Sequence, residues 1–326
     1  MKLLITGANG FVGSAVCHDL ARQQHQVLAI SRSLDSLAST KLLSIDEHSA
    51  QYLCWLEADF GNILSIHEHL LGCDAIVHCA ARVHQVRETA AHPLAAYRQV
   101  NTEATLALAR AAAHSGVKRF VFLSSVKVNG EYTAAGNLYH SNQANPQDPY
   151  GLSKWEAELG LREIAAQTGM DVVIIRPALV YGPGVKANFL SMMHWLHKGV
   201  PLPLGAIRNQ RSFIALPNLV SLIEACLTHP AAAGQTFMAS DQRDLSTTEL
   251  LHMMGVAMKR PARLISVSQS LMETSLKLIG KSGIAQRLCG SLAVDSSPAT
   301  QLLGWKPPVS VEQGLQLTAD HYLASH

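Results

Sequence analysis

Short apolar runs alternate with longer amphipathic stretches through the first half of this chain. Six runs have the length and apolar content of buried strands, and they cover residues 2–6, 26–31, 52–58, 75–79, 119–124 and 171–176. Helical patterns fill the intervals, and the clearest is an Ala-rich stretch over 94–114 that ends at Ser115 and Gly116. Because strands alternate with helices, we predict an α/β fold built on a Rossmann-type, doubly wound parallel sheet.

The pattern becomes irregular after residue 177. Turn-rich stretches (GPG, PLPLGA and HPAAAG) separate helical patterns over 188–198, 217–228, 247–258 and 268–279. We therefore expect a Rossmann domain over 1–176 and a smaller, mixed α/β lobe over 177–326. No low-complexity linker separates the two parts, so we expect segments of the second to pack back on the first.

The composition is typical of a globular enzyme and excludes some classes of partner. The chain has 326 residues, of which 48% are hydrophobic and 15% are charged, and its net charge is +2. Because it has no basic run, neither nucleic acid nor an anionic membrane surface is an expected partner. The apolar start is too short for a signal peptide, and Arg176 and Pro177 interrupt the longest apolar run, so we expect no membrane span.

Cysteines and histidines give no sign of a disulfide framework or of a metal site. The six cysteines form no CxxC pair, which indicates reduced thiols in a cytoplasmic protein. Among the 16 histidines, His67 and His69 project from different sides of a helical stretch. His194 and His197 share a helix face but have no evident third ligand, so we predict no metal.

A glycine-rich loop follows the first predicted strand directly. In TGANGFVG, Gly7, Gly10 and Gly13 are spaced three apart and precede a helical pattern. Glycines at such a turn let the backbone approach a pyrophosphate at a helix N-terminus, where free N–H groups and the helix dipole favour anions. The loop therefore indicates a dinucleotide site, although a plain Gly-rich turn between strand and helix fits the same spacing.

The end of the second predicted strand bears on which dinucleotide binds. An acidic residue there would bind the ribose hydroxyls of NAD, but this chain has Ser31, Arg32 and Ser33. A guanidinium and hydroxyl groups suit a 2′-phosphate, so NADP(H) is favoured as cofactor and NAD(H) stays open. The alternative is that Arg32 is simply solvated after the strand.

Tyr150 and Lys154 are four residues apart at the start of a helical pattern, so they project from one face. A phenol with a pKa of about 10 is a poor base near neutral pH, but a neighbouring ammonium stabilises its phenolate. A hydroxyl of Ser124 or Ser125, at the end of the fifth strand, can bond to an alcohol or ketone. Together these groups indicate general acid/base catalysis beside a hydride acceptor.

In this order, TGANGFVG, the Ser-Ser pair and YGLSK resemble the extended short-chain dehydrogenase/reductase family of nucleotide-sugar epimerases, dehydratases and reductases. The resemblance extends as far as LGWKPP near the end of the chain. It implies that Ser125, Tyr150 and Lys154 are catalytic, and that Lys154 also binds the nicotinamide ribose. It further implies cofactor contacts from these residues: Gly7, Gly10, Phe11, Val12, Gly13, Asp59, Phe60, Ala80, Ala81, Asn101, Tyr150 and Pro177.

The resemblance also implies a UDP-sugar as substrate. Its contacts would fall on Asn188 and Phe189 of KANFL and on Arg211 of NQRSF, and a guanidinium suits a diphosphate. Arg287 is either a further phosphate ligand or a surface residue. The family usually has an acidic residue where this chain has Asn218, so we expect that corner of the site to be built differently.

Two further expectations concern the fourth strand and the quaternary structure. Arg82 and His84 follow the carboxyl end of that strand, where open α/β sheets place ligands, so they are candidates for substrate contact. Alternatively, they cap the following helix. By resemblance, helices over 94–114 and 150–168 are expected to pair in a homodimer.

The residues after the catalytic serine separate the reactions of this family. The family's 4,6-dehydratases have an Asp-Glu pair there, whereas this chain has Val126 and Lys127, so elimination of water is disfavoured. The open reactions are 4-ketoreduction of a UDP-4-keto-6-deoxy-N-acetylhexosamine for bacterial O-antigen, and 4-epimerisation of UDP-glucose or UDP-N-acetylglucosamine with tightly bound NAD. Arg32 and Asn129, which replaces a tyrosine of UDP-galactose-type epimerases, favour the reductase. The retained catalytic residues disfavour a non-catalytic NADP-binding sensor.

Overall fold

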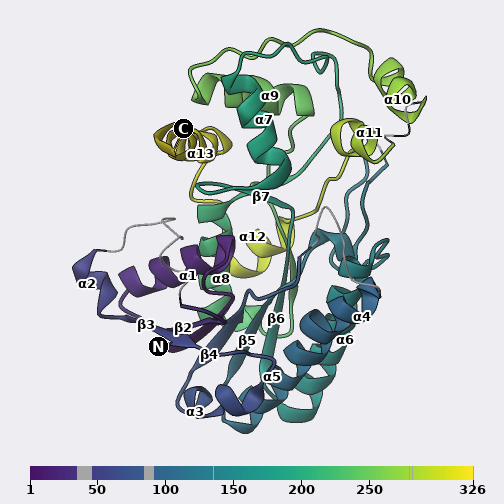
Figure 1. The fold of residues 1–326 in the computed structure, drawn as a ribbon. Helices are drawn as coiled ribbons and strands as arrows, with labels where there is room; N and C mark the ends of the chain where they lie inside the picture. Colours follow the sequence, from purple (N-terminus) through teal and green to yellow (C-terminus); the bar gives the residue numbers. More distant parts are fainter. Residues whose placement is uncertain (35–45, 84–91, 135, 279, 281, 326) are drawn as a thin grey trace.

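A seven-stranded parallel sheet forms the centre of the computed structural model, which describes residues 1–34, 46–83, 92–134, 136–278, 280 and 282–325 (Figure 1). The strand order is β3-β2-β1-β4-β5-β6-β9. The strands are β1 (Lys2–Thr6), β2 (Gln26–Ser31), β3 (Leu53–Glu57), β4 (Ala75–His78), β5 (Arg119–Leu123), β6 (Asp171–Pro177) and β9 (Thr236–Ala239). The predicted Rossmann-type α/β fold is confirmed.

The order of the strands places a ligand site at one edge of the sheet. From β1 the chain moves outward to β2 and β3, and then returns to β4 on the other side of β1. Parallel sheets bind ligands outside the carboxyl ends of their strands, where the strand order reverses in this way. The loops that follow β1 and β4 meet at this point.

Helices cover both faces of the sheet (Figure 1). Leu3 and Ile5 of β1 pack in one apolar cluster with α1 (Phe11–Arg22) and α8 (Leu216–Thr228). Leu4, which points to the opposite face, packs with α5 (Ala104–His114) and α6 (Pro149–Thr168). All three side chains are completely buried, and each contributes about 2 kcal/mol to folding.

The seventh strand, β9, comes from the second half of the chain. It pairs with β6 in parallel, so the six strands expected from the sequence were one too few. Its four residues, TFMA, are too short a run to stand out in the sequence. Since α8 also covers the first part of the chain, the contacts cross the division that the sequence suggested at residue 177; that division stays a proposal.

The remaining part of the second half forms a lobe with its own apolar core. This core lies among α7 (Ala187–His197), α9 (Thr247–Ala257) and α13 (Val311–Ser325). A short parallel pair of β7 (Leu179–Tyr181) and β8 (Phe213–Ala215) supports it. The helices expected over 188–198, 217–228, 247–258 and 268–279 are present within two residues at each end, the last as α10 (Gln269–Leu278). Shorter helices complete the fold: α2 (Glu47–Ala50), α3 (His67–Leu70), α11 (Ser282–Cys289) and α12 (Ser297–Leu303).

The helix expected over 94–114 is interrupted by a wider turn. It consists of α4 (Pro93–Tyr97), a π-helical segment (Arg98–Glu103) and α5. Such π-helical insertions inside α-helices are frequent at functional sites, because they shift the direction of the side chains that follow. Asn101 lies in this segment.

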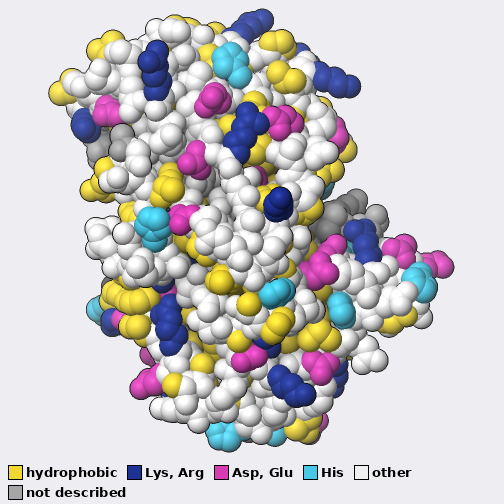
Figure 2. Space-filling view, turned by 180° about the vertical axis from the view of Figure 1, so that it is seen from behind, with side chains coloured by type: hydrophobic (Ala, Val, Ile, Leu, Met, Phe, Trp, Pro, Cys, Tyr) yellow, Lys and Arg dark blue, Asp and Glu magenta, His cyan; other side chains and the backbone are white. Residues whose placement is uncertain are grey.

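Neither the charged surface in Figure 2 nor the His, Cys, Asp and Glu side chains of the described residues indicate a further site. Figure 2 shows basic and acidic side chains interspersed over the face that it draws. In the described ranges, no helix combines the length and the apolar character that a membrane span requires. Those ranges also hold no group of three or more His, Cys, Asp or Glu side chains that could bind a metal ion. All six cysteines are free thiols, and Cys54 is exposed.

Candidate active site

The three proposed catalytic residues come from two adjacent elements. Ser125 follows β5 and caps a short 3-10 helix, where its hydroxyl accepts a hydrogen bond from the Lys127 N–H at 3.2 Å. Tyr150 and Lys154 lie on the first turns of α6, which begins after the capping residue Asp148. The Ser125 side chain interacts with the Tyr150 phenol, in the direction that lowers the pKa of that phenol. The sequence left Ser124 and Ser125 open, and Ser125 is the one that meets the phenol.

Burial governs the protonation of Tyr150 and Lys154. It raises the pKa of Tyr150 to about 12, against the hydrogen bond from Ser125, so the phenol holds its proton at neutral pH. Burial also lowers the pKa of Lys154 to about 7, an effect that Cys79 and Glu158 oppose. The Lys154 ammonium donates to the Leu123 carbonyl at 2.9 Å and lies 4.4 Å from the ring centroid of Phe122. The pKa values of Tyr150 and Lys154 are therefore sensitive to any charge placed beside these side chains.

The glycine loop has the shape of a pyrophosphate cradle. Gly7 has a φ of +66°, and a Cβ there would lie 2.7 Å from the Ala80 nitrogen. A Cβ on Gly13 would lie 2.1 Å from the Gly7 oxygen. Gly10 precedes α1, whose first turn has no acidic residue and whose N-terminus has no side-chain cap. The residues present therefore fit a dinucleotide whose pyrophosphate lies against free N–H groups.

The residues proposed for the adenosine end lie at the ends of β2 and β3. Arg32 is exposed, whereas the Ser31 hydroxyl is buried and donates to the Ser33 carbonyl at 2.8 Å. Next to them, the Glu57 carboxylate accepts a hydrogen bond from the Leu34 N–H at 3.0 Å. The ends of β2 and β3 thus combine the exposed Arg32 guanidinium with the Glu57 carboxylate, which the sequence analysis did not consider.

Asp59 and Phe60 follow β3 and differ in their surroundings. Asp59 is exposed and accepts a hydrogen bond from the Gly61 N–H at 2.9 Å. Phe60 is buried, with its ring centroid 5.1 Å from that of His78. The Phe60 side chain therefore belongs to the core and not to an exposed ligand surface.

Asn101 connects the loop after β4 to the catalytic helix. Its side chain accepts from the Arg82 N–H at 2.8 Å, and donates to the Arg82 carbonyl at 3.0 Å and to the Ser153 hydroxyl at 3.0 Å. The Arg82 guanidinium lies 5.4 Å from the ring centroid of Tyr97, whose ring in turn lies 6.1 Å edge-on from Tyr150. Tyr97, which the sequence analysis missed, therefore lies between Arg82 and Tyr150. His84 lies outside the described residues.

The remaining cofactor candidates surround the same edge of the sheet. Ala80 and Ala81 follow β4, and Pro177 ends β6 beside Ala239 of β9. Val12 and Phe11 open α1. Ala80 meets the glycine loop directly, whereas Phe11 also lines a cavity on the outer side of that helix.

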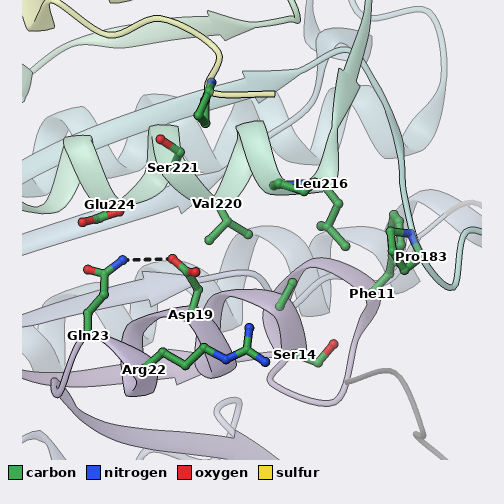
Figure 3. Close-up of a pocket in the computed structure, with 13 residues that line it drawn as sticks. Phe11, Ser14, Asp19, Arg22, Gln23, Pro183, Leu216, Val220, Ser221 and Glu224 are labelled. Carbon is green, nitrogen blue, oxygen red and sulfur yellow. Dashed lines mark hydrogen bonds between the residues drawn. The ribbon is translucent and has the colours of Figure 1, made fainter. Parts of the chain in front are cut away.

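That cavity, of about 390 Å³, runs between α1 and α8 and contains no catalytic candidate among its lining residues (Figure 3). Its polar end holds Asp19, hydrogen-bonded to Gln23 at 3.0 Å, and Glu224 across the groove. Burial and the charge of Glu224 raise the pKa of Asp19. The groove is therefore separate from the acid/base site.

The substrate-side candidates are not all directed at a ligand. Asn188 is exposed on α7, but Phe189 is buried and stacks on Tyr181 at 5.4 Å, in the core of the lobe. Arg211 is partly buried, donates to the Gly290 carbonyl at 2.9 Å, and has a pKa that burial lowers. Arg287 is exposed and bonds to its own helix at the Gly283 carbonyl.

The corner at Asn218 is built around a carboxylate from another element. Asp241, just after β9, accepts hydrogen bonds from Asn218 at 2.7 Å, from the Ala215 N–H at 2.9 Å and from the Tyr181 hydroxyl at 2.8 Å. Burial raises the pKa of Asp241. The Asn218 side chain is thus bonded to a carboxylate from residue 241, a contact for which the sequence holds no signal.

The comparisons with known proteins identify the family. The sequence model of the NAD dependent epimerase/dehydratase family matches residues 3–239. The chain belongs to this family. A protein named UDP-glucose 4-epimerase, from Vibrio cholerae, is 41% identical to it over 328 aligned residues, which cover 100% of this chain and 96% of that protein.

More distant members of the family share the whole length. An N-acetyl-alpha-D-glucosaminyl-diphospho-ditrans,octacis-undecaprenol 4-epimerase from Escherichia coli O157:H7 is 25% identical, covering 98% of this chain and 95% of that one. Two crystal structures share the fold. UDP-glucuronic acid 4-epimerase from Bacillus cereus in complex with NAD has a TM-score of 0.76 at 20% identity, covering 99% of both chains. UDP-glucose 4-epimerase with UDP-glucose from Thermotoga maritima has a TM-score of 0.77 at 20% identity, covering 100% of this chain and 99% of that one.

Membership of the epimerase/dehydratase family confirms the resemblance and the prediction of an enzyme that works with a nicotinamide dinucleotide. The family description and the NAD-bound neighbour support NAD, and they do not support the predicted preference for NADP(H). The roles of individual residues stay proposals, which the geometry above makes specific.

Proposed function

We propose that this chain is a 4-epimerase of UDP-hexoses that keeps NAD bound during turnover. The observation that carries this proposal is the interaction of the Ser125 side chain with the Tyr150 phenol, together with the glycine cradle, in a chain 41% identical over its whole length to a protein named UDP-glucose 4-epimerase. The neighbours named for UDP-glucose and UDP-glucuronic acid support the same class of substrate.

The protein supplies proton transfer and positioning for this reaction. Tyr150 takes the proton of the sugar's C4 hydroxyl as a phenolate and returns it as a phenol, while the Ser125 hydroxyl holds the same oxygen. The ammonium of Lys154, one helical turn from Tyr150, stabilises the phenolate when it is charged. Bound NAD supplies the acceptor for the C4 hydrogen, and the glycine loop holds its pyrophosphate.

The choice of NAD rests on the end of β3. A 2′-phosphate next to Arg32 would also lie near the Glu57 carboxylate, which repels an added negative charge. The Ser31 hydroxyl, already bonded to the Ser33 carbonyl, is not directed at the ribose. A free 2′-hydroxyl is therefore the better fit at this turn.

Arg211 is the proposed ligand of the substrate diphosphate. It is partly buried, and none of the carboxylates that the structure describes pairs with it. A partly buried guanidinium without a counter-charge is stabilised by an anion with two oxygens in reach. Asn188 is a proposed contact on the exposed side of α7, whereas Phe189 shapes the lobe from its core.

A reductase of UDP-4-keto-6-deoxy-N-acetylhexosamines, as used for O-antigen, is the second candidate. The exposed Arg32 favours it, because a reductase exchanges NADPH at every turnover. Val126 is buried and Lys127 bonds to Glu131 at 2.9 Å, so neither replaces the acid/base pair of a dehydratase. Both candidates use the same Ser125 and Tyr150.

One experiment separates the two candidates. Purified protein is denatured and the released nucleotide identified, and the native protein is incubated with UDP-glucose without added cofactor. Retained NAD with formation of the C4 epimer supports the proposal. Protein free of nucleotide, which oxidises added NADPH with a UDP-4-keto-6-deoxy-N-acetylhexosamine and forms no epimer, supports the reductase instead.

We also propose a homodimer in which α5 and α6 of two copies pair. Leu159 on α6 is 48% exposed, and it offers an apolar contact on the exposed side of this helix. Light scattering at micromolar concentration tests the dimer, and a monomer contradicts it. The six free thiols support a reducing compartment, the cytoplasm, as the proposed location.

A further inference from the structure

A fully buried ion pair lies next to the catalytic residues. The side chains of Glu158 on α6 and Arg176 on β6 are both 0% exposed. The guanidinium donates to the two carboxylate oxygens of Glu158 at 2.9 and 2.6 Å. Buried ion pairs are often no more stabilising than apolar side chains of the same volume, so stability alone does not account for this one.

The carboxylate of Glu158 reaches the strand end that carries the catalytic serine. It accepts a hydrogen bond from the Ser124 hydroxyl at 2.6 Å. The Ser124 N–H is bound in turn to the Ile175 carbonyl at 2.7 Å. Because Ser124 directly precedes Ser125, Glu158 helps to fix the position from which the Ser125 hydroxyl meets Tyr150.

The guanidinium of Arg176 reaches the segment that leads into the catalytic helix. Its Nη1 donates to the Asn129 side-chain oxygen at 3.0 Å, to the Ser141 carbonyl at 3.1 Å and to the Gln143 carbonyl at 2.9 Å. Asn129, which stands where UDP-galactose-type epimerases usually have a tyrosine, is itself buried and is part of this support. The ion pair therefore touches both segments that carry catalytic groups.

Glu158 also lies one helical turn after Lys154, and its charge raises the pKa of Lys154 against the effect of burial. Around the same ammonium lie His78 at the end of β4, on whose ring the ammonium acts, and Cys79 directly after β4, which raises the pKa of Lys154 as Glu158 does. Arg176 faces Glu158 from β6. Loss of the Glu158 charge would leave this region more positive.

We propose that Glu158, held by Arg176, is a positioning residue that sets a negative charge one helical turn from Lys154 and holds the Ser124–Ser125 end of β5 in place. This inference rests on the proposed function, because it assigns Glu158 an effect on the acid/base pair of Tyr150 and Lys154. Tyr150 and Lys154 lie one helical turn apart on α6. Removal of a nearby negative charge makes it easier for either side chain to lose its proton, so the pKa of both is lowered.

The test is the pH profile of kcat in Glu158→Gln, an isosteric change that removes the charge. Both limbs are expected to move to lower pH by roughly one unit, with KM changed less than about twofold. The double variant Glu158→Gln/Arg176→Gln removes both charges of the pair. Its profile is expected to return to within about 0.3 unit of the unmodified enzyme, because the net charge near Lys154 is restored.

Arg162→Gln is the matched control. Arg162 also bonds to the Glu158 carboxylate, at 3.0 Å, but its side chain is 38% exposed and screened by solvent. Its profile is expected to stay within about 0.3 unit of the unmodified enzyme. The inference is overturned if the limbs of the kcat pH profile do not move in a folded Glu158→Gln protein. It is also overturned if they move as far in the double variant as in Glu158→Gln.

Two further measurements keep the inference testable. Carbon-13 NMR titration of Lys154, assigned with Lys154→Arg, reports its charge without any substrate, so failure of the proposed epimerase activity is distinguishable from failure of this inference. An unshifted titration in Glu158→Gln contradicts it.

Where that variant does not fold, Ser124→Ala is expected to lower kcat about tenfold at unchanged KM and Tm. An unchanged kcat contradicts the positioning role.

Discussion

The two sides of the candidate site are built in different ways. The cofactor side consists mainly of backbone: a glycine loop whose atoms leave no space for a Cβ, and the carboxyl ends of β1 and β4. The proposed substrate side consists of side chains from the second lobe, such as Asn188 and Arg211, and Arg211 is bonded to the distant Gly290 carbonyl. A backbone cradle is specified locally by glycines, whereas a side-chain pocket depends on how the whole lobe packs.

The largest expected effect is at the point where the two sides meet. Tyr150→Phe removes the hydroxyl that transfers the proton and is expected to lower kcat by about a thousandfold. The Phe ring keeps the packing against Tyr97, so the cofactor content of the purified protein should not change. Steady-state kinetics and nucleotide analysis measure both quantities, and turnover at the unmodified rate contradicts the assignment of the base.

The backbone character of the cofactor side is tested at Gly13. Gly13→Val places atoms where a Cβ already lies 2.1 Å from the Gly7 oxygen, and is expected to weaken dinucleotide binding by at least about a hundredfold.

Gly116→Ala is the control for Gly13→Val. Gly116 has a positive φ but nothing within 4 Å of its Cβ position. It is expected to lose about 1 kcal/mol of stability and no affinity. Calorimetric titration with NAD measures both variants; equal affinities argue against the cradle.

The side-chain character of the substrate side is tested at Arg211. Arg211→Met removes the proposed diphosphate ligand and is expected to raise KM for the UDP-sugar by about tenfold to a hundredfold, with a smaller change in kcat. Arg287→Met is the matched control, because Arg287 is exposed and bonded within its own helix. A larger rise in KM for Arg287→Met than for Arg211→Met would indicate that Arg287, and not Arg211, binds the diphosphate.

Lys154 is also expected to make the stability of the protein depend on pH. Its pKa is 10.5 in the reference state and about 7 in the folded protein, so the unfolded chain binds the additional proton between these values. The contribution of Lys154 to stability is therefore least favourable below pH 7 and improves as pH rises towards 10.5. Lys154→Met should remove this trend. Scanning calorimetry at several pH values checks it, and parallel curves for both proteins would contradict it.

The sequence was sufficient for the cofactor side because its signals are local. Continuous apolar runs placed β1 and β2 at their observed bounds, and the spacing of Gly7, Gly10 and Gly13 located the loop before α1. The i, i+4 spacing of Tyr150 and Lys154 placed both on the first turns of α6.

The substrate side could not be derived in the same way, because its contacts connect positions far apart in sequence. Phe189 looked like a ligand contact but stacks on Tyr181 in the core, a packing that no local pattern shows. Asp241 reaches Asn218 only because β9 joins the sheet beside β6. In the sequence, Glu158 and Arg176 look like ordinary charged residues, because no local pattern shows that both side chains are completely buried.

The transfer of a label at C4 tests the central claim most directly. UDP-glucose that carries deuterium at C4 is incubated with the purified protein and no added cofactor, and the products are separated and analysed by mass spectrometry and NMR. The account predicts the C4 epimer with its deuterium retained at C4, because the same bound NAD accepts and returns it at the Tyr150 site. Release of the label into free nucleotide, with no epimer formed, would contradict it.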